Sequence, residues 1–104
     1  MLDKKKYPDA YVELLFNRSK AYLYEKKHSK ALKSIDEIFS LIDDKDNRKS
    51  FFYAQKGRVY LDEGKKEEAK KEFFKMASEI HSDTIPLLKS VENFKPSNLS
   101  SINI

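Results

Sequence analysis

The stretch "YAQKGRVYLDEGKKEEAKKEFF", residues 53–74, contains both glycines of this 104-residue chain. Its apolar residues recur at helical spacing, and a glycine inside a helix costs about 1 kcal/mol relative to alanine. Gly57 therefore indicates a position where two helices pack so closely that only a very small side chain fits. Gly64 indicates the left-handed residue of a sharp turn. The stretch predicts two helices that fold back on one another as a hairpin.

Apolar periodicity along the whole chain predicts five helices, at residues 8–26, 29–42, 48–63, 66–81 and 84–94. Their short connections predict antiparallel neighbours. Residues 95–104 contain turn residues without periodicity and are expected to form a flexible tail. On the first helix, the face predicted to be apolar carries Tyr11, Leu14, Leu15, Arg18, Ala21 and Tyr22.

Composition agrees with a single all-α domain at residues 1–94. Charged residues make up 37% of the chain and apolar residues 39%, which is typical of thin helical proteins with a narrow core. The net charge of +4 is mild, because basic and acidic residues are interleaved. Without cysteine the chain has no disulfide and no thiolate metal site. No membrane span or signal peptide is recognised, so we expect a cytoplasmic protein.

The two halves of the chain align with an offset of 38 residues. At this offset Ala31 aligns with Ala69 and Ser19 with Gly57. Further aligned pairs are Leu15 with Tyr53, Tyr22 with Tyr60, Leu23 with Leu61 and Ile35 with Phe73. The offset equals a unit of about 34 residues plus a longer link, for which residues 46–49, "DNRK", are the candidate. The alignment predicts two hairpins of the same kind.

These residues resemble the tetratricopeptide repeat in two units, residues 12–45 and 50–83. The second unit matches the pattern at Tyr53, Gly57, Tyr60, Gly64, Ala69, Phe73 and Met76, and the first at Leu15, Ser19, Tyr22, Ala31, Ile35 and Ile38. The chain departs from the family in having Lys26 at the turn position and no proline at the end of either unit. Arg18 and Lys56 replace the usual leucine, and we expect their charges to lie in water.

The resemblance implies a short right-handed superhelix in which the first helix of each unit lines a concave groove. Residues 84–94 would then form a capping helix over the apolar residues of the fourth helix, Phe73, Phe74, Met76 and Ile80. The implied groove residues are Glu13, Phe16, Asn17, Lys20, Leu23 and Tyr24 from the first unit and Phe51, Ala54, Gln55, Arg58, Leu61 and Asp62 from the second.

Within the groove we single out Asn17, Lys20, Tyr24, Gln55, Arg58 and Asp62 as the candidate peptide-binding residues. An amide side chain can pair with the backbone of an extended peptide, and a neighbouring cation can hold a carboxylate. The predicted partner is therefore a protein or a short peptide, either acidic or with a free carboxylate. An equally simple interpretation is that these residues are polar because an exposed helix face requires it.

Catalysis is not predicted, and neither a metal nor a cofactor is expected. His28 and His81 stand apart from each other and from any regular carboxylate spacing. The acidic stretch "DDKD", residues 43–46, lacks the glycine and the closing glutamate of a calcium loop. We interpret it as a solvated link.

Among repeat proteins, short lysine-rich units of this kind are similar to the sensor domains of bacterial peptide-responsive regulators. Two alternatives remain open. The ends of the module could stack on each other to form a homo-oligomer. Nucleic acid could bind the basic residues Lys4, Lys5, Lys6, Lys26, Lys27, Lys30 and Lys33, although the mixed charges of residues 65–75 disfavour this interpretation.

Overall fold

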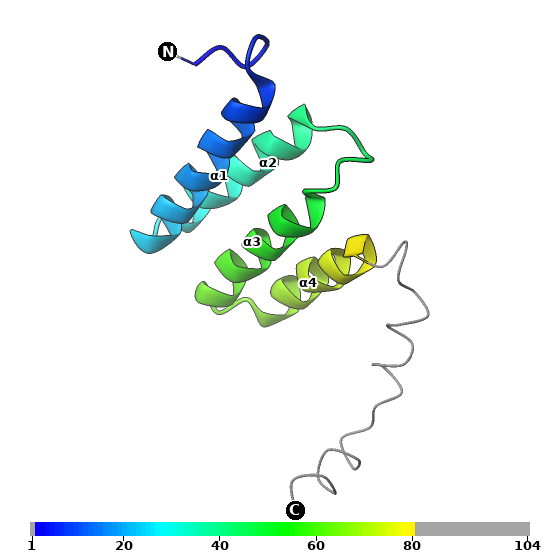
Figure 1. Cartoon of the computed structure of the whole chain (residues 1–104). Helices are drawn as coiled ribbons and strands as arrows, with labels where there is room; N and C mark the ends of the chain where they lie inside the picture. The colour runs from blue at the N-terminus through cyan, green and yellow to red at the C-terminus, as the bar shows by residue number, and fades with distance from the viewer. Residues whose placement is uncertain (1, 81–104) are drawn as a thin grey trace, which may run out of the picture.

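The structure, a computed structural model, describes residues 2–80, which form four α-helices. The helices are α1 (Pro8–Tyr24), α2 (His28–Leu41), α3 (Lys49–Asp62) and α4 (Lys66–Ile80), labelled in Figure 1. Each observed end lies within two residues of its predicted position. The predicted helix at residues 84–94 and the predicted tail at residues 95–104 lie outside the described residues.

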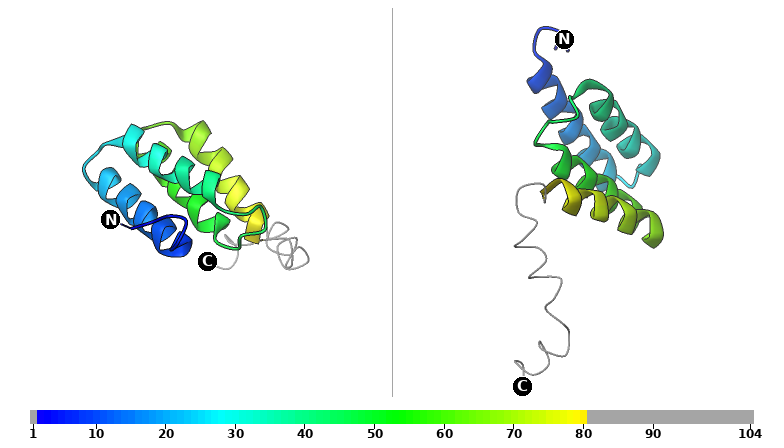
Figure 2. Two further views of the ribbon diagram at one scale, coloured as in Figure 1. Left: turned by 90° about the horizontal axis from the view of Figure 1, so that it is seen from above. Right: turned by 90° about the vertical axis from the view of Figure 1, so that its right-hand side faces the viewer.

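The four helices form two antiparallel hairpins, with α1 packed on α2 and α3 packed on α4. Contacts between α2 and α3, and a smaller set between α1 and α3, join the two hairpins. The two views of Figure 2 show the hairpins lying one against the other. The all-α hairpin architecture predicted from the sequence is therefore confirmed, and α1 and α3 run side by side in the same direction (Figure 1).

Both hairpins turn through the same backbone geometry. Lys26 and Gly64 occupy the left-handed region, with φ of 63° and 84°. Each donates its N–H to the carbonyl three residues earlier, and the next residue donates to the carbonyl five residues before itself. These two hydrogen bonds define the Schellman motif that closes many helices. The predicted role of Gly64 is confirmed, and a lysine adopts the same conformation in the first hairpin.

A close helix crossing explains the other glycine. A Cβ atom built on Gly57 would lie 2.5 Å from Cε1 of Phe73, so α3 and α4 approach as closely as the sequence predicted. The aligned residue in the first hairpin, Ser19, is fully buried. Its Oγ donates a hydrogen bond to the carbonyl of Ala31 at 3.1 Å. Ala31 and Ala69 are both buried, with 0% and 1% of their surface exposed.

The buried face of α1 differs from the predicted one. Its buried residues are Val12, Leu15 and Ser19, whereas Leu14 and Arg18 are exposed. The prediction followed apolar spacing, but the burial of α1 is decided by α2 on one side and α3 on the other. The main cluster of buried apolar side chains comprises Val12, Leu15, Ile35, Ile38 and Phe52.

Lys56 does not extend its charge into water, which corrects the sequence-based expectation. Its Nζ lies 3.1 Å from Oδ1 of Asp36 on α2 and 3.6 Å from Oε1 of Glu72 on α4. Burial, the largest single effect, lowers the pKa of the Lys56 ammonium, but Asp36, Glu72 and Tyr60 together outweigh burial and raise the pKa above its ordinary value. The ammonium therefore joins three helices. The aligned cation, Arg18, is exposed as expected.

Candidate functional site

The predicted groove residues do not all lie on an open surface. Asn17, Lys20, Tyr24, Arg58 and Asp62 are exposed. Gln55 is buried, with 2% of its surface exposed, and so is Ala54. Neither of these two residues is accessible to a peptide, so the prediction that they line the groove is wrong.

Gln55 instead completes a buried polar chain between the hairpins. Its Nε2 donates to Oγ of Ser19 at 3.4 Å, and that hydroxyl donates in turn to the Ala31 carbonyl. Because a buried amide without a partner is costly, this contact fixes the orientation of the Gln55 side chain toward the interior. The two candidate amides, Asn17 and Gln55, therefore do not lie on one surface.

An apolar pocket lies between the first turns of α1 and α3. Its volume is about 300 Å³. The residues that line it are Asp9, Val12, Glu13, Phe16, Arg48, Phe51 and Phe52. The rings of Phe16 and Phe52 meet edge to face, with their centroids 5.5 Å apart, while Phe51 is 64% exposed at the mouth. The pocket thus offers preformed aromatic walls to an apolar group.

Three charged residues line this pocket, and two of them, Asp9 and Arg48, form an ion pair with each other. The Arg48 guanidinium contacts Asp46 at 2.7 Å and Asp9 at 3.2 Å. Asp46 holds the pKa of Arg48 above its usual range, and Arg48 in turn lowers the pKa of the Asp46 carboxyl. Glu13 is exposed and makes no hydrogen bond or ion pair within residues 2–80. The edge of the pocket therefore carries an excess of negative charge.

Cations follow further along the same face. The Nζ of Lys20 lies 4.5 Å from the centroid of the Phe16 ring, so Lys20 directly adjoins the pocket wall. Arg58 follows Phe51 by seven residues on α3 and therefore lies on the same side of that helix. We call the exposed residues Glu13, Asn17, Lys20, Phe51 and Arg58, together with the partly buried Phe16, the α1–α3 face.

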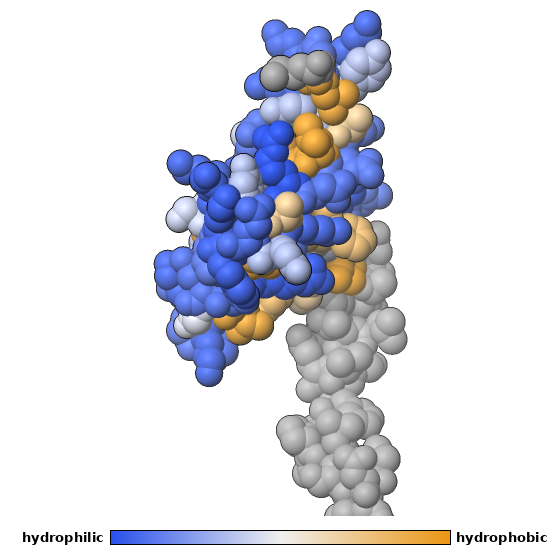
Figure 3. All heavy atoms as spheres, turned by 90° about the vertical axis from the view of Figure 1, so that its left-hand side faces the viewer, coloured by the Kyte–Doolittle hydropathy of each residue, from blue (hydrophilic) through white to orange (hydrophobic). Residues whose placement is uncertain are grey.

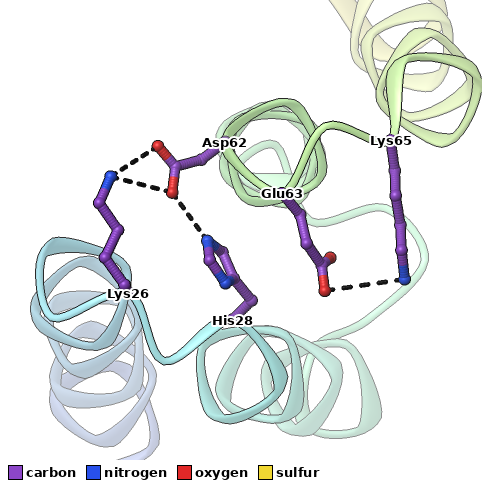
Figure 4. A network of polar contacts seen from close by, with 5 residues as sticks. All are labelled: Lys26, His28, Asp62, Glu63 and Lys65. Atoms are coloured by element: carbon purple, nitrogen blue, oxygen red, sulfur yellow. Dashed lines mark hydrogen bonds and ion pairs between the residues drawn. The ribbon is translucent and has the colours of Figure 1, made fainter.

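Asp62 lies at the turn end of the molecule, where it ties the two hairpins together. Its carboxylate contacts Nζ of Lys26 at 2.8 Å and Nε2 of His28 at 2.7 Å. Figure 4 shows these three side chains pointing toward one another, beside the separate pair of Glu63 and Lys65. Lys26, followed by His28, lowers the pKa of Asp62. Asp62 is therefore engaged within the chain, unlike Arg58.

The side of the molecule that carries both hairpin turns is predominantly hydrophilic, with small separate apolar areas (Figure 3). Several of its lysines are paired within the chain. Lys26 binds Asp62, and Nζ of Lys27 lies 3.0 Å from Glu25. These contacts reduce the positive charge that the turn of the first hairpin presents to solvent.

The sequence-based reasoning missed four of the residues that form the pocket. Val12 and Phe52 are buried wall residues. Val12 precedes Phe16 by four residues on one face of α1, whereas Phe52 is the chain neighbour of Phe51. Asp9 and Arg48 meet only because the link before α3 brings its last residue beside the start of α1. Helical spacing could have indicated Val12, but it does not relate Phe52 to Phe51, because consecutive residues point about 100° apart around a helix. No local pattern predicts the contact between Asp9 and Arg48.

Within residues 2–80, no group of three or more histidine, aspartate or glutamate side chains is placed to hold a metal ion. None of the described helices has the length and apolarity needed to cross a membrane. Comparisons with protein-family models, curated proteins and solved structures found no match for this chain.

Proposed function

We propose that this chain is a non-enzymatic peptide- or protein-binding module that uses the α1–α3 face. One observation carries the proposal. An apolar pocket of about 300 Å³ lies on this face, and the Lys20 ammonium lies against Phe16, one of its wall residues. Apolar pockets with a few charged groups nearby are typical of binding sites, since the apolar part gives affinity and the charges give orientation. A partner carboxylate would bind Lys20 and Arg58, while Asn17 would bind its backbone.

The matched turns support a tetratricopeptide-like arrangement. Lys26 and Gly64, 38 residues apart, close their helices with the same hydrogen bonds. Ala31 and Ala69, at the same offset, are both buried. On this interpretation the two hairpins form part of a short right-handed superhelix, with α1 and α3 on its concave side. A module of this kind fits a role in a peptide-responsive regulator.

A charge reversal at Arg58 tests the proposal. The probe is a short peptide with one phenylalanine and a free carboxyl-terminal carboxylate, compared with its amidated form. We expect Arg58→Glu to weaken binding of the free-carboxylate peptide about tenfold, as for the loss of a hydrogen bond to a charged group. Isothermal titration calorimetry measures the change, and Lys71→Glu, on the exposed surface of α4, is the matched control. Equal affinities of wild type and Arg58→Glu would refute the assignment of this face.

Self-association is the second candidate, because α4 presents Phe74 with 76% of its surface exposed. An exposed aromatic side chain of this size marks a candidate contact between copies. Light scattering over a range of concentrations would detect a dimer, and Phe74→Ser should abolish it. A strict monomer at high concentration would remove this candidate.

A further inference from the structure

The α1–α3 face changes its charge along the direction of α1. Asp9, Glu13, Phe16 and Lys20 follow one another at helical spacing, which gives two acids, an aromatic ring and then a cation. On α3 only the second half of this order recurs, because Phe51 at the pocket precedes the cation Arg58 and no acid precedes Phe51 on that helix. The apolar pocket therefore lies between an acidic end and a basic end.

Charge at the acidic end is available to a partner. Glu13 lines the pocket, is exposed and has no hydrogen bond or ion pair within the described residues. Arg48, the cation at this end, is held by Asp46 and Asp9. Those two carboxylates and Glu13 outnumber the single guanidinium. A ligand group beside the pocket at this end is thus favoured if it is positively charged.

The distance between the two ends matches a short extended chain. Glu13 and Lys20 are seven residues apart on α1, a rise of about 10 Å along the helix. In an extended peptide, residues i, i+2 and i+4 point to the same side and span about 13 Å. Long side chains at the outer positions easily cover the difference. A peptide of five residues is therefore long enough to contact the acidic end, the pocket and the basic end together.

We infer that the ligand of this face is an extended segment with a cation, an apolar side chain and a carboxylate on alternate residues, the cation facing Glu13 and the apolar group filling the pocket. This inference rests on the proposed function and adds to it the acidic end of the site. The order of charges in the ligand follows from the face, because Glu13 attracts the cation and Lys20 attracts the carboxylate. Its apolar anchor contacts Phe16, Phe51 and Phe52.

The test is a double-mutant cycle between the peptide cation and Glu13. The probe is a dye-labelled peptide with lysine, phenylalanine and glutamate on alternate positions separated by serine, and a second peptide has serine in place of the lysine. For wild type we expect the lysine peptide to bind about threefold to fivefold more tightly, as for one ion pair at the surface. In Glu13→Gln this difference should vanish. Glu67→Gln, at an exposed carboxylate on α4, should retain it.

The outcomes separate the inference from the proposed function. If wild type binds both peptides equally but requires the phenylalanine, the acidic-end assignment is wrong and the peptide-binding proposal survives. If replacing the phenylalanine by serine changes nothing, or if no peptide binds, both are wrong. A lysine preference that persists in Glu13→Gln also overturns the inference. So does a dimer that dissociates in Phe51→Ser, because the pocket would then hold a second copy.

Discussion

The two hairpins share two backbone features, a left-handed turn and a close helix crossing, but place different residues at them. At the turn, the first hairpin uses Lys26 and the second uses Gly64, both in the left-handed region. At the close crossing, the first has the buried Ser19 and the second has Gly57. The second hairpin therefore uses glycine where the first uses a side chain, and each of these side chains makes a contact with the other hairpin.

Those contacts explain the difference. Lys26 reaches Asp62, and Ser19 receives a hydrogen bond from Gln55. Both partners belong to α3, so the first hairpin uses these positions to hold the second one. A left-handed lysine costs about 1 kcal/mol relative to glycine. At Lys26 the ion pair with Asp62, which joins the two hairpins, offsets this cost.

Adding a methyl group at the tighter crossing should have the largest effect. Because its Cβ would lie 2.5 Å from Phe73, Gly57→Ala should lower the free energy of unfolding by about 2 kcal/mol. Helix propensity alone predicts the opposite sign, a gain of about 1 kcal/mol. Urea denaturation followed by circular dichroism measures the change. The same substitution in a Phe73→Leu background should be less damaging, and a stabilised Gly57→Ala protein would contradict the close crossing.

Exchanging the turn residues should have a smaller effect. No atom lies within 4 Å of a Cβ built on Gly64, but its φ of 84° makes any side chain unfavourable. Gly64→Ala should therefore cost about 1 kcal/mol. Lys26→Gly should change stability less, since relief of the left-handed backbone offsets the lost contact with Asp62. Thermal unfolding of both variants makes the comparison. A gain in stability of about 1 kcal/mol in Lys26→Gly would show that the Lys26 side chain has no compensating role.

The stabilisation by the Asp62 contacts with Lys26 and His28 should depend on pH, and it is the smallest of the three expected effects. The pKa of Asp62 lies below its ordinary value of 3.8, because Lys26 and His28 favour the carboxylate. A carboxylate whose pKa is depressed on folding stabilises the protein above the unfolded pKa and loses this effect as pH falls through the folded pKa. The stability difference between wild type and Asp62→Asn should thus be present at pH 7 and shrink below pH 3.8. A difference independent of pH would argue against this ion pair.

Much of the hairpin architecture could be read from local patterns. Apolar periodicity located all four described helices, and Gly57 and Gly64 indicated a close crossing and a turn, as observed. These features depend on residues near in sequence, where spacing and backbone preference act directly. The repeat family, the superhelix and the partner stay predictions, because no comparison matched the chain.

The candidate site was predicted less well. The sequence indicated the exposed Lys20 and Arg58 and placed Phe16 and Phe51 on the same side, but it also assigned Gln55 to the surface. A glutamine on a helix carries no local sign of whether it faces solvent or a hydroxyl on another helix. Its burial depends on where Ser19 lies, 36 residues earlier.

By itself, the sequence determined where the helices begin and end and where the chain must turn, because periodicity, glycine and link residues act over a few positions. The tertiary structure decided which faces are buried, that Lys56 bridges three helices, and that Asp9 and Arg48 meet beside an aromatic pocket. Those outcomes depend on how one hairpin packs against the other. Packing of this kind is set by the shapes and charges of residues far apart in the chain, which no local pattern encodes.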